Sequence, residues 1–429
     1  MRFFRDKTLP ELKRSRGYYD GTGQKIMSRT YADATKANNR IVKNYCKSAV
    51  DNFRGYIAGQ PITYAANDDS DISALLDCFN ENDIINSDSE WLKNALIYGQ
   101  APQLCYINER NEKKFRNLSP EQVIPIYSAD LDEELRYVVY FYPIVDWDRE
   151  DWYCRYSVNV YDDTSIYHYT CDDGFNSFQV DGEPEEHFFG AVPFSIFYLN
   201  DDATSIFECI IGLQDAYNKL ISDSVNDWES FVDCYMVITG GDIDPKDIAT
   251  MKENRVMLLE DTMNVSYLTK NTTDTQVQNL LDEINTAIHT IANSPDFSSE
   301  EFGSGVSSGI ALQFKLVGFN NIASNIEAQF RKAIQKRIEL LNAVFSLLDT
   351  STYEVNISFT HNLPTNIADT ANTVNTLRGL VSRETLLAQL PFISDVDAEM
   401  ERVNAENELS LGALYNFGNE EEESAEEEE

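Results

Sequence analysis

The chain has 429 residues, 42% of them hydrophobic, and a net charge of −38. The hydrophobic content can build a core and excludes wholesale disorder, while single-sign acidity on this scale excludes a surface that grips DNA through Lys and Arg on phosphates. The last ten residues hold eight glutamates, so the remainder still carries −30. We expect that glutamate-rich end, part of an acidic disordered tail over 413–429, to repel itself and stay unfolded.

Seven cysteines are spread singly along the sequence, without the spacing of a zinc site. Such an odd, unpatterned set is typical of reduced thiols in a cytoplasmic setting, and we predict no metal and no cofactor. The first residues, MRFFRDKTLPELKRSR, lack the apolar core of a signal peptide. No apolar run approaches the roughly 18 residues that span a bilayer, so no membrane association is expected.

The first hundred residues are predicted to be an arm followed by helices. Residues 1–32 are polar and basic, which is typical of an arm or a poorly ordered tail. Apolar residues at helical spacing follow, and Gly59, Gln60 and Pro61 end that pattern. The expected elements are a helix over 33–58, a strand from 62–64, and shorter helices near 72–80 and 87–98.

Residues 103–199 are predicted to be mainly β-structure, because Tyr, Val and Ile alternate between turn residues. A hairpin connection is expected at 161–165. Acidic pairs at 146/148 and 185/186 sit beside turns; solvated turn residues are the favoured interpretation, and catalytic carboxylates the alternative. The expected strands are 103–108, 123–127, 135–145, 152–162, 165–171 and 194–199.

Two long helices, 204–234 and 274–292, are predicted on either side of a small α/β module at 235–273. Asp244 and Pro245 predict the start of a short helix in the module, and its strands are expected at 235–239, 256–259 and 265–268. The first long helix carries six acidic side chains against Lys219 alone, a charge of about −5. A solvated helix face is the ordinary interpretation of that charge.

A Ser- and Gly-rich loop at 293–307 is predicted to lead into the longest helix, 308–350. The stretch 294–314 has no Lys or Arg, and FGSGVSSG lacks the lysine of a P-loop, so we expect no nucleotide site. The long helix has apolar residues at steps of three and four, and Gly318 predicts a bend near 318–321. An ordinary amphipathic core helix is the alternative. A strand at 353–359 and helices at 366–380, 383–389 and 396–409 follow.

The order of these elements and seven local motifs resembles the portal proteins of long-tailed, siphovirus-type bacteriophages of Gram-positive hosts. The resemblance lies in their collinear order rather than in any one motif. The motifs are NNRIVKNYCKSAVDNFRGYIAGQPITY (38–64), LIYGQAPQLCYINE (96–109), LSPEQVIPIY (118–127), FFGAVPFSIFYLND (188–201), LQDAYNKLISDSVNDWE (213–229), FGSGVSSGIALQFKL (302–316) and ISFTHNLPTN (357–366).

The resemblance implies an α+β portal-type subunit in a ring of about twelve copies at one capsid vertex, with double-stranded DNA passing along the axis during packaging and ejection without sequence-specific binding. The implied regions are a β-rich wing (33–203 with 353–365), stem helices (204–234 and 274–292), a clip (235–273), a tunnel loop (293–307), a long connecting helix (308–352) and a helical crown (366–412).

The resemblance also implies which residues serve each region. The expected channel wall on the stem is Asp215, Asp223, Asp227, Glu229 and Asp233. The expected tunnel-loop residues are Asp296, Phe297, Glu300, Glu301, Phe302, Gly303 and Gly305. The expected docking residues on the clip are Asp244, Lys246, Lys252 and Arg255. An acidic wall that repels phosphate would suit a low-friction conduit.

Expected partners are the terminase large subunit, head-completion or adaptor proteins, and the major capsid and scaffolding proteins. The expected location is the virion, after assembly in the host cytoplasm. No motif predicts catalysis, so we expect a structural protein rather than an enzyme. Two other classes stay open: an acidic carbohydrate-active hydrolase built on the Tyr-rich strands, and another capsid or head-completion protein.

Overall fold

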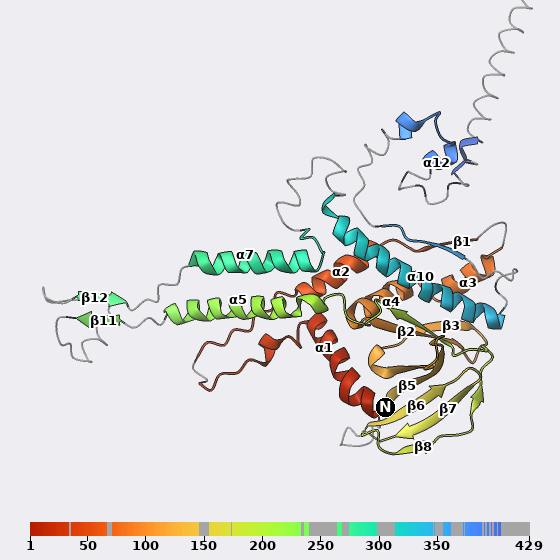
Figure 1. Cartoon of the computed structure of the whole chain (residues 1–429), viewed down its shortest axis with the longest axis horizontal. Coiled ribbons are helices and arrows are strands. Elements are labelled where there is room, and N and C mark those ends of the chain that lie inside the picture. Colours follow the sequence, from red (N-terminus) through yellow and green to blue (C-terminus); the bar gives the residue numbers. More distant parts are fainter. Residues whose placement is uncertain are drawn as a thin grey trace, which may run out of the picture. The chain divides into compact units, whose positions relative to one another are not determined.

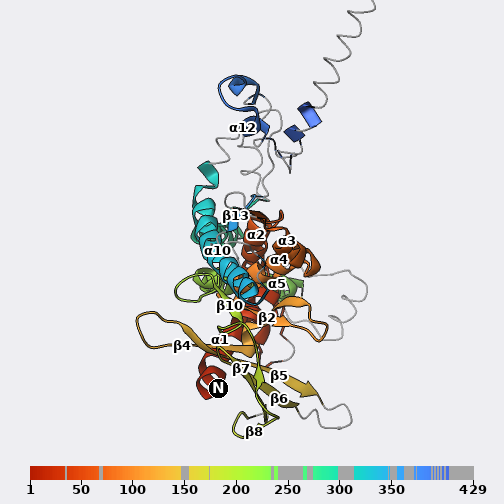
Figure 2. The same ribbon diagram turned by 90° about the vertical axis from the view of Figure 1, so that its right-hand side faces the viewer.

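The computed structural model divides into two compact units, Met1–Ser299 with Lys315–Asn362 and Glu300–Phe314 with Leu363–Glu429. Its helices and strands confirm the mixed α+β class. Figures 1 and 2 show the chain from two directions. The structure describes residues 1–33, 36–66, 71–145, 154–172, 174–232, 236–239, 264–267, 274–297, 314–345, 347, 355–361 and part of 372–404.

The N-terminal segment is folded, so the prediction of a poorly ordered arm is wrong. A short π-helix, Phe4–Thr8, leads into α1, Leu9–Asp20, which ends at Gly21 with a φ of 81°. Tyr18 and Tyr19 are buried, and α1 packs on α2 and α4. The apolar residues that anchor this segment are few and are interspersed with basic ones, which masked the helix in the sequence.

The helix predicted over 33–58 is shorter than expected. The described residues 36–44 are extended, and α2 runs over Tyr45–Ile57 with Asn44 accepting the Lys47 N–H as its N-cap. The next predictions are confirmed with small shifts in their ends: β1 at Thr63–Ala66, α3 at Ser73–Glu81, and α4 at Ile84–Tyr98 with Gly99 as its C-cap.

Two antiparallel sheets occupy residues 100–198. One has the order β10-β2-β3 and the other β4-β5-β6-β7-β8, with β9 beside β7. All six predicted strands and the 161–165 hairpin are confirmed, while β3, β8 and β9 were missed, because β3 and β9 are short and polar and β8 has only three residues. The strands are β2 Gln100–Ile107, β3 Lys113–Asn117, β4 Val123–Tyr127, β5 Leu135–Val145, β6 Cys154–Tyr161, β7 Ser165–Cys171, β8 Phe178–Val180, β9 Glu185–Glu186 and β10 Phe194–Tyr198.

A core cluster joins the two sheets through Val138, Tyr161 and Phe194, together with three further buried side chains. Tyr161 and Phe194 meet edge to face, with ring centroids 5.1 Å apart. This cluster fixes the six-stranded sheet to the rest of the first unit.

Residues 208–291 have the predicted helix–strands–helix order. A 3-10 turn, Glu208–Ile210, leads into α5, Ile211–Val232. An antiparallel pair, β11 Met236–Thr239 and β12 Asn264–Tyr267, precedes α7, Asp274–Ile291. Helices α5 and α7 pack side by side (Figure 1). The predicted strand at 256–259 lies outside the described residues.

The longest helix is α10, Val317–Phe345, at 29 residues. Gly318 is its second residue. Residues 314 and 315 are also helical, and a turn at Leu316 separates them from α10, so the helix is interrupted just before the predicted bend at 318–321; residues 308–313 lie outside the described residues. β13, Val355–Ser358, returns to pair antiparallel with β1. In the second unit α12, Arg383–Leu387, confirms part of one predicted helix, and most of the other two lies outside the described residues.

Candidate functional site: the stem, the loop base and the long helix

One face of α5 carries four polar side chains at four-residue spacing, all of them buried. They are Gln214, Asn218, Ser222 and Asn226. We call them the polar row. Residues this far apart on a helix are about 6 Å apart along its axis, one above the next. Buried polar groups need partners, so the row must meet a matching set of donors or acceptors.

The partner of the polar row is the non-helical backbone of residues 39–44 together with Tyr45, the first residue of α2, and we call residues 39–45 the strap. The N–H groups of alternate strap residues donate to successive row side chains. The donor–acceptor distances are 2.8 Å for Asn39 to Asn226, 2.9 Å for Ile41 to Ser222, 3.0 Å for Lys43 to Asn218, and 2.8 Å for Tyr45 to Gln214. Two extended residues advance about 6.6 Å, close to one helical step of four, so the two repeats stay in phase.

Three of the acidic side chains on this helix and its leading turn contact the N-terminal segment. Tyr18 donates its hydroxyl to Asp215 at 3.0 Å, and Arg29 pairs with Asp223 at 2.5 Å. Glu208 pairs with Arg14 at 2.5 Å. Burial raises the pKa of Tyr18, and its hydrogen bond to Asp215 adds to that shift. Asp215 and Asp223 are therefore committed to contacts within the subunit.

The remaining predicted wall residues lie towards the end of α5. Asp227 and Glu229 are exposed, and Trp228 between them has 69% of its surface accessible. Asp233 lies outside the described residues, as do all four predicted clip residues. Among the acids predicted to line the wall, the structure thus separates two that contact the N-terminal segment, Asp215 and Asp223, from two at an exposed helix end.

The base of the predicted tunnel loop is packed against α2, α7 and α10. His289 Nδ1 lies 2.8 Å from the Ser294 carbonyl oxygen, and Asn52 donates to the Ser294 hydroxyl at 3.0 Å. The Asp296 carboxylate is 3.9 Å from His289 Nε2. Phe297 meets Phe319 of α10 edge to face, with centroids 6.2 Å apart. The other five predicted loop residues lie outside the described residues.

The loop base and the start of α10 approach each other at Gly318. A Cβ at that position would lie 2.6 Å from the Asn293 Oδ1 atom. Asn293 itself has a φ of 46°, a conformation that Asn tolerates better than most residues. Glycine at 318 therefore serves close packing of the two ends of the 294–317 segment.

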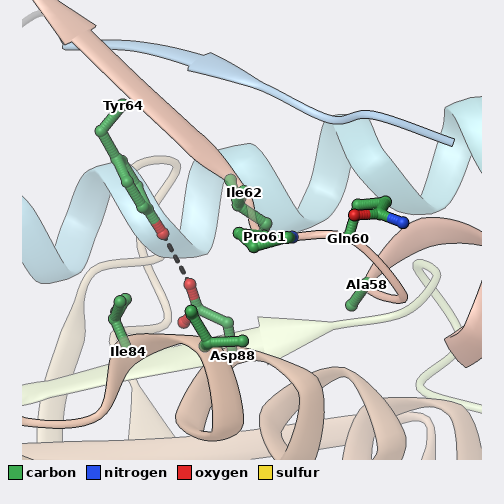
Figure 3. Close-up of a pocket in the computed structure, with 8 residues that line it drawn as sticks. Ala58, Gln60, Pro61, Ile62, Tyr64, Ile84 and Asp88 are labelled. Carbon is green, nitrogen blue, oxygen red and sulfur yellow. Dashed lines mark hydrogen bonds between the residues drawn. The ribbon is translucent and has the colours of Figure 1, made fainter. Parts of the chain in front are cut away.

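A buried ion pair holds α10 to α4. Arg337 and Asp88 are 2.6 Å apart, and their side chains are 0% and 3% exposed. Tyr64 of β1 donates to the other Asp88 oxygen at 2.6 Å, which Figure 3 shows beside a pocket of about 10 Å³. That volume fits about one water molecule, so the pocket is too small for a ligand.

Aromatic rings complete the environment of Arg337. Its guanidinium carbon lies 4.9–5.4 Å from the ring centroids of Phe79, Trp91 and Phe115. Burial disfavours the charge, but Asp88 outweighs it and the pKa of Arg337 is raised. The sequence held a signal that was missed: Arg337 falls on the apolar stripe of α10, where only a paired charge is tolerated.

A second polar cluster joins α2 and α10 to the residues after β13. His361 Nε2 lies 2.6 Å from Glu327, and the ring stacks on Tyr56 at 4.4 Å. Tyr56 donates to Asn320 at 2.7 Å. The lone His of the 357–366 motif is therefore a structural contact, as expected for a turn histidine.

The described residues offer little to the hydrolase alternative. Glu185 and Glu186 are exposed on a two-residue strand, and the 146/148 pair lies outside the described residues. Among the residues that the structure describes, no group of three metal-binding side chains was found. None of the described helices is long and apolar enough to cross a membrane.

The chain is similar to known proteins. Residues 5–410 match the family model described as phage portal protein, SPP1 Gp6-like. The portal protein of Bacillus phage SPP1 is 25% identical over 92% of this chain and 80% of its own length. The portal protein of Clostridium phage phiCD119 is 20% identical, over 87% of this chain and 86% of its own.

Solved structures of the necks of empty and native GTA particles also align. Both are 11% identical, with TM-scores of 0.43 and 0.44. They cover 82% and 81% of this chain, and the alignments span 88% and 89% of those chains. Similarity at this level decides neither fold nor assembly. The family match, which covers nearly the whole chain, does decide the family: the chain belongs to the SPP1 Gp6-like phage portal proteins.

Proposed function

We propose that this protein forms a ring of about twelve copies at one vertex of a bacteriophage capsid, and that double-stranded DNA is packaged and ejected through the ring. The observation that carries the proposal is the family match over residues 5–410. The order of α5, the β11–β12 pair, α7 and α10 supports it, because this is the order expected for stem, clip, stem and connecting helix.

Each region then has a proposed role. The sheets form the wing, α5 and α7 the stem, residues 235–273 the clip, and residues 366–412 the crown. The acidic wall rests on Asp227, Glu229 and Asp233, since Asp215 and Asp223 hold the N-terminal segment. Exposed carboxylates would repel the phosphates of passing DNA, so the duplex would slide without sequence-specific binding.

The loop at 293–307 is proposed to face the channel from a fixed base. The contacts of Ser294 and Phe297 anchor its first residues. Its glycines, Gly303 and Gly305, would let loops of neighbouring copies shift as DNA passes. Replacing both with valine should impair packaging in a complementation assay while leaving rings intact; a normal packaging rate would show that loop mobility is irrelevant.

The partners are proposed by role. The terminase large subunit and head-completion or adaptor proteins would dock on the clip, through Asp244, Lys246, Lys252 and Arg255. The major capsid and scaffolding proteins would surround the ring in the virion, after assembly in the host cytoplasm. The portal protein itself performs no catalysis in this proposal, and the energy for packaging comes from its partner.

Negative-stain microscopy with native mass spectrometry tests the central claim. Purified protein should give rings with a central hole and a mass near twelve copies. A strictly monomeric species at micromolar concentration would overturn the proposal. ATP turnover by the purified chain, abolished by a point change in it, would overturn the non-catalytic part alone.

A further inference from the structure

A groove of about 570 Å³ runs between α10 and β13. Three basic side chains line it from the helix, Arg331, Lys332 and Lys336, and all three are exposed. They lie within six residues of a chain whose net charge is −38. A concentrated positive patch on so acidic a protein is unusual, and its charge attracts an anionic partner.

The groove's own contacts leave this charge largely uncompensated. Lys336 lies 3.5 Å from Glu339, the one carboxylate among the described residues that line the groove. Arg331 donates instead to the Ile357 carbonyl of β13 at 3.2 Å, and Lys332 lies 3.4 Å from the Gln329 amide oxygen. Three cations thus face one acid, and the groove retains a net positive charge.

The strand wall of the groove also has an open side. β13 pairs with β1 alone in a two-stranded sheet of the described residues. Its side chains alternate, with Val355 and Ile357 buried and Asn356 and Ser358 exposed. An extended peptide suits such a site, because it can follow the strand while its side chains reach the basic helix face.

The same chain carries an acidic segment of matching form at residues 178–186, which we call the acidic edge. Every residue in it is exposed. It begins with β8, the last strand of the six-stranded sheet, where Val180 has 75% of its surface accessible. Four carboxylates follow: Asp181, Glu183, Glu185 and Glu186. An edge strand presents unpaired backbone N–H and C=O groups with which another chain can pair.

A second exposed acidic segment, the β4–β5 turn, is less suitable. Two of its four acids already have partners within the turn: Arg136 lies 3.3 Å from Glu134 and 4.0 Å from Asp130, and Ser128 donates to Asp130. In the acidic edge, the Nε2 atom of His168 lies 3.7 Å from Glu185. The acidic edge therefore has more uncompensated charge to offer.

The groove and the acidic edge cannot satisfy each other within one copy. Both belong to the first unit, and α10 and β8 lie apart in both views (Figures 1 and 2). Two complementary surfaces at different places on one chain make a head-to-tail contact between copies, and such contacts form a ring when the rotation between copies closes.

We propose that the acidic edge of one copy docks into the basic groove of the next. The inference rests on the proposed ring and names two surfaces that would hold neighbouring copies together. Because the charges are exposed, the contact is screened by salt, so rings should dissociate more readily as ionic strength rises.

Charge reversal on each surface tests the contact. The groove variant carries Arg331→Glu, Lys332→Glu and Lys336→Glu; the edge variant carries Asp181→Lys, Glu183→Lys and Glu186→Lys. Glu185 is left in place because of His168. The ring fraction of each variant alone, measured by native mass spectrometry, should fall at least about tenfold, because like charges now meet at the contact.

Mixing the two variants provides the specific readout. In an alternating ring every groove again meets an edge of opposite sign, so equal amounts of both should restore rings that contain the two variants in equal number. A control with Lys7→Glu, Lys13→Glu and Lys25→Glu makes the same charge change as the groove variant, but at exposed sites elsewhere. It should keep its rings.

Folding is checked separately. Arg331→Glu also removes a hydrogen bond to β13, so a second groove variant changes only Lys332 and Lys336, and circular dichroism and thermal unfolding should match the wild type. If both surface variants keep the ring fraction of the wild type, or if mixing them fails to restore rings, the proposed contact is wrong while the proposed function stands. A wild-type chain without rings would overturn the proposed function and the contact with it.

Discussion

Helices α5 and α10 both bury polar groups, yet they are held in different ways. On α10 one charged residue, Arg337, meets one carboxylate, Asp88, with no exposure to water. On α5 four neutral side chains each take one backbone N–H from the strap. The first arrangement concentrates its stabilising free energy at a single ion pair, and the second distributes it over four hydrogen bonds along the helix. If α5 is the stem helix of the proposed ring, the second arrangement would suit a helix that must adjust to a neighbouring copy.

The largest effect should come from breaking the buried pair. Asp88→Asn keeps an acceptor for Tyr64 but leaves the Arg337 charge uncompensated, which should cost about 3–5 kcal/mol in the free energy of unfolding. Tyr64→Phe is the matched control, because it removes one hydroxyl and should cost about 1–2 kcal/mol. Chemical denaturation followed by circular dichroism measures both.

A double variant sharpens this prediction. Asp88→Leu with Arg337→Met replaces both charges with apolar groups of similar size, and such replacements are often neutral or stabilising. It should be more stable than Asp88→Asn. If the double variant is the less stable of the two, aromatic contact with the guanidinium outweighs the ion pair, and the comparison with α5 would need another basis.

One rung of the polar row should cost less. Asn218→Ala leaves the Lys43 N–H without its acceptor, a loss of about 1–3 kcal/mol. Ser224→Ala is the control on the same helix, since that hydroxyl donates only to the Leu220 carbonyl and its loss should cost about 0.5 kcal/mol or less. Limited proteolysis should also cut residues 36–44 faster in the first variant. Equal cleavage in both would mean that the strap does not depend on single rungs.

The helices and strands of this fold could be predicted from the sequence better than the contacts between them. Apolar periodicity located α4, α7, α10 and the strands of the two sheets, because those elements bury one face. It misjudged the described residues 36–44, where the N–H groups of residues 39, 41 and 43 donate to side chains of α5 rather than within a helix. Such pairing across nearly 190 positions leaves no local pattern.

The candidate site shows the same limit. Acidic residues on α5 were identified by composition, but Asp215 and Asp223 differ from Asp227 and Glu229 only through contacts with Tyr18 and Arg29. Likewise, Gly318 predicted a bend by propensity, whereas its surroundings show a close approach to Asn293. Tertiary contacts decided each case.

A smaller effect is expected at Gly318, where two terms oppose each other. Gly318→Ala gains helix propensity of about 1 kcal/mol but places a Cβ 2.6 Å from the Asn293 amide oxygen. We expect a net loss of about 1 kcal/mol, an order-of-magnitude figure for an overpacked site. In the Asn293→Gly background the clash is absent and glycine keeps the positive φ, so the same substitution should stabilise. Thermal unfolding of the four chains measures this change of sign; its absence would mean that Asn293 simply rotates away.

The smallest effect is predicted for the glutamate-rich end. Residues 420–429 carry eight like charges, and a segment of that composition cannot bury enough apolar surface to offset the entropy of ordering it. Truncation after Asn419 should therefore leave the unfolding temperature and the ring fraction unchanged. Removing eight negative charges should also slightly ease the mutual repulsion of copies in a ring, so rings of the truncated chain should resist low salt at least as well as those of the full chain. Loss of soluble rings on truncation would show instead that the glutamates make a structural contact. Such a contact is not expected, because the contacts described on α5 and α10 do not involve residues 420–429.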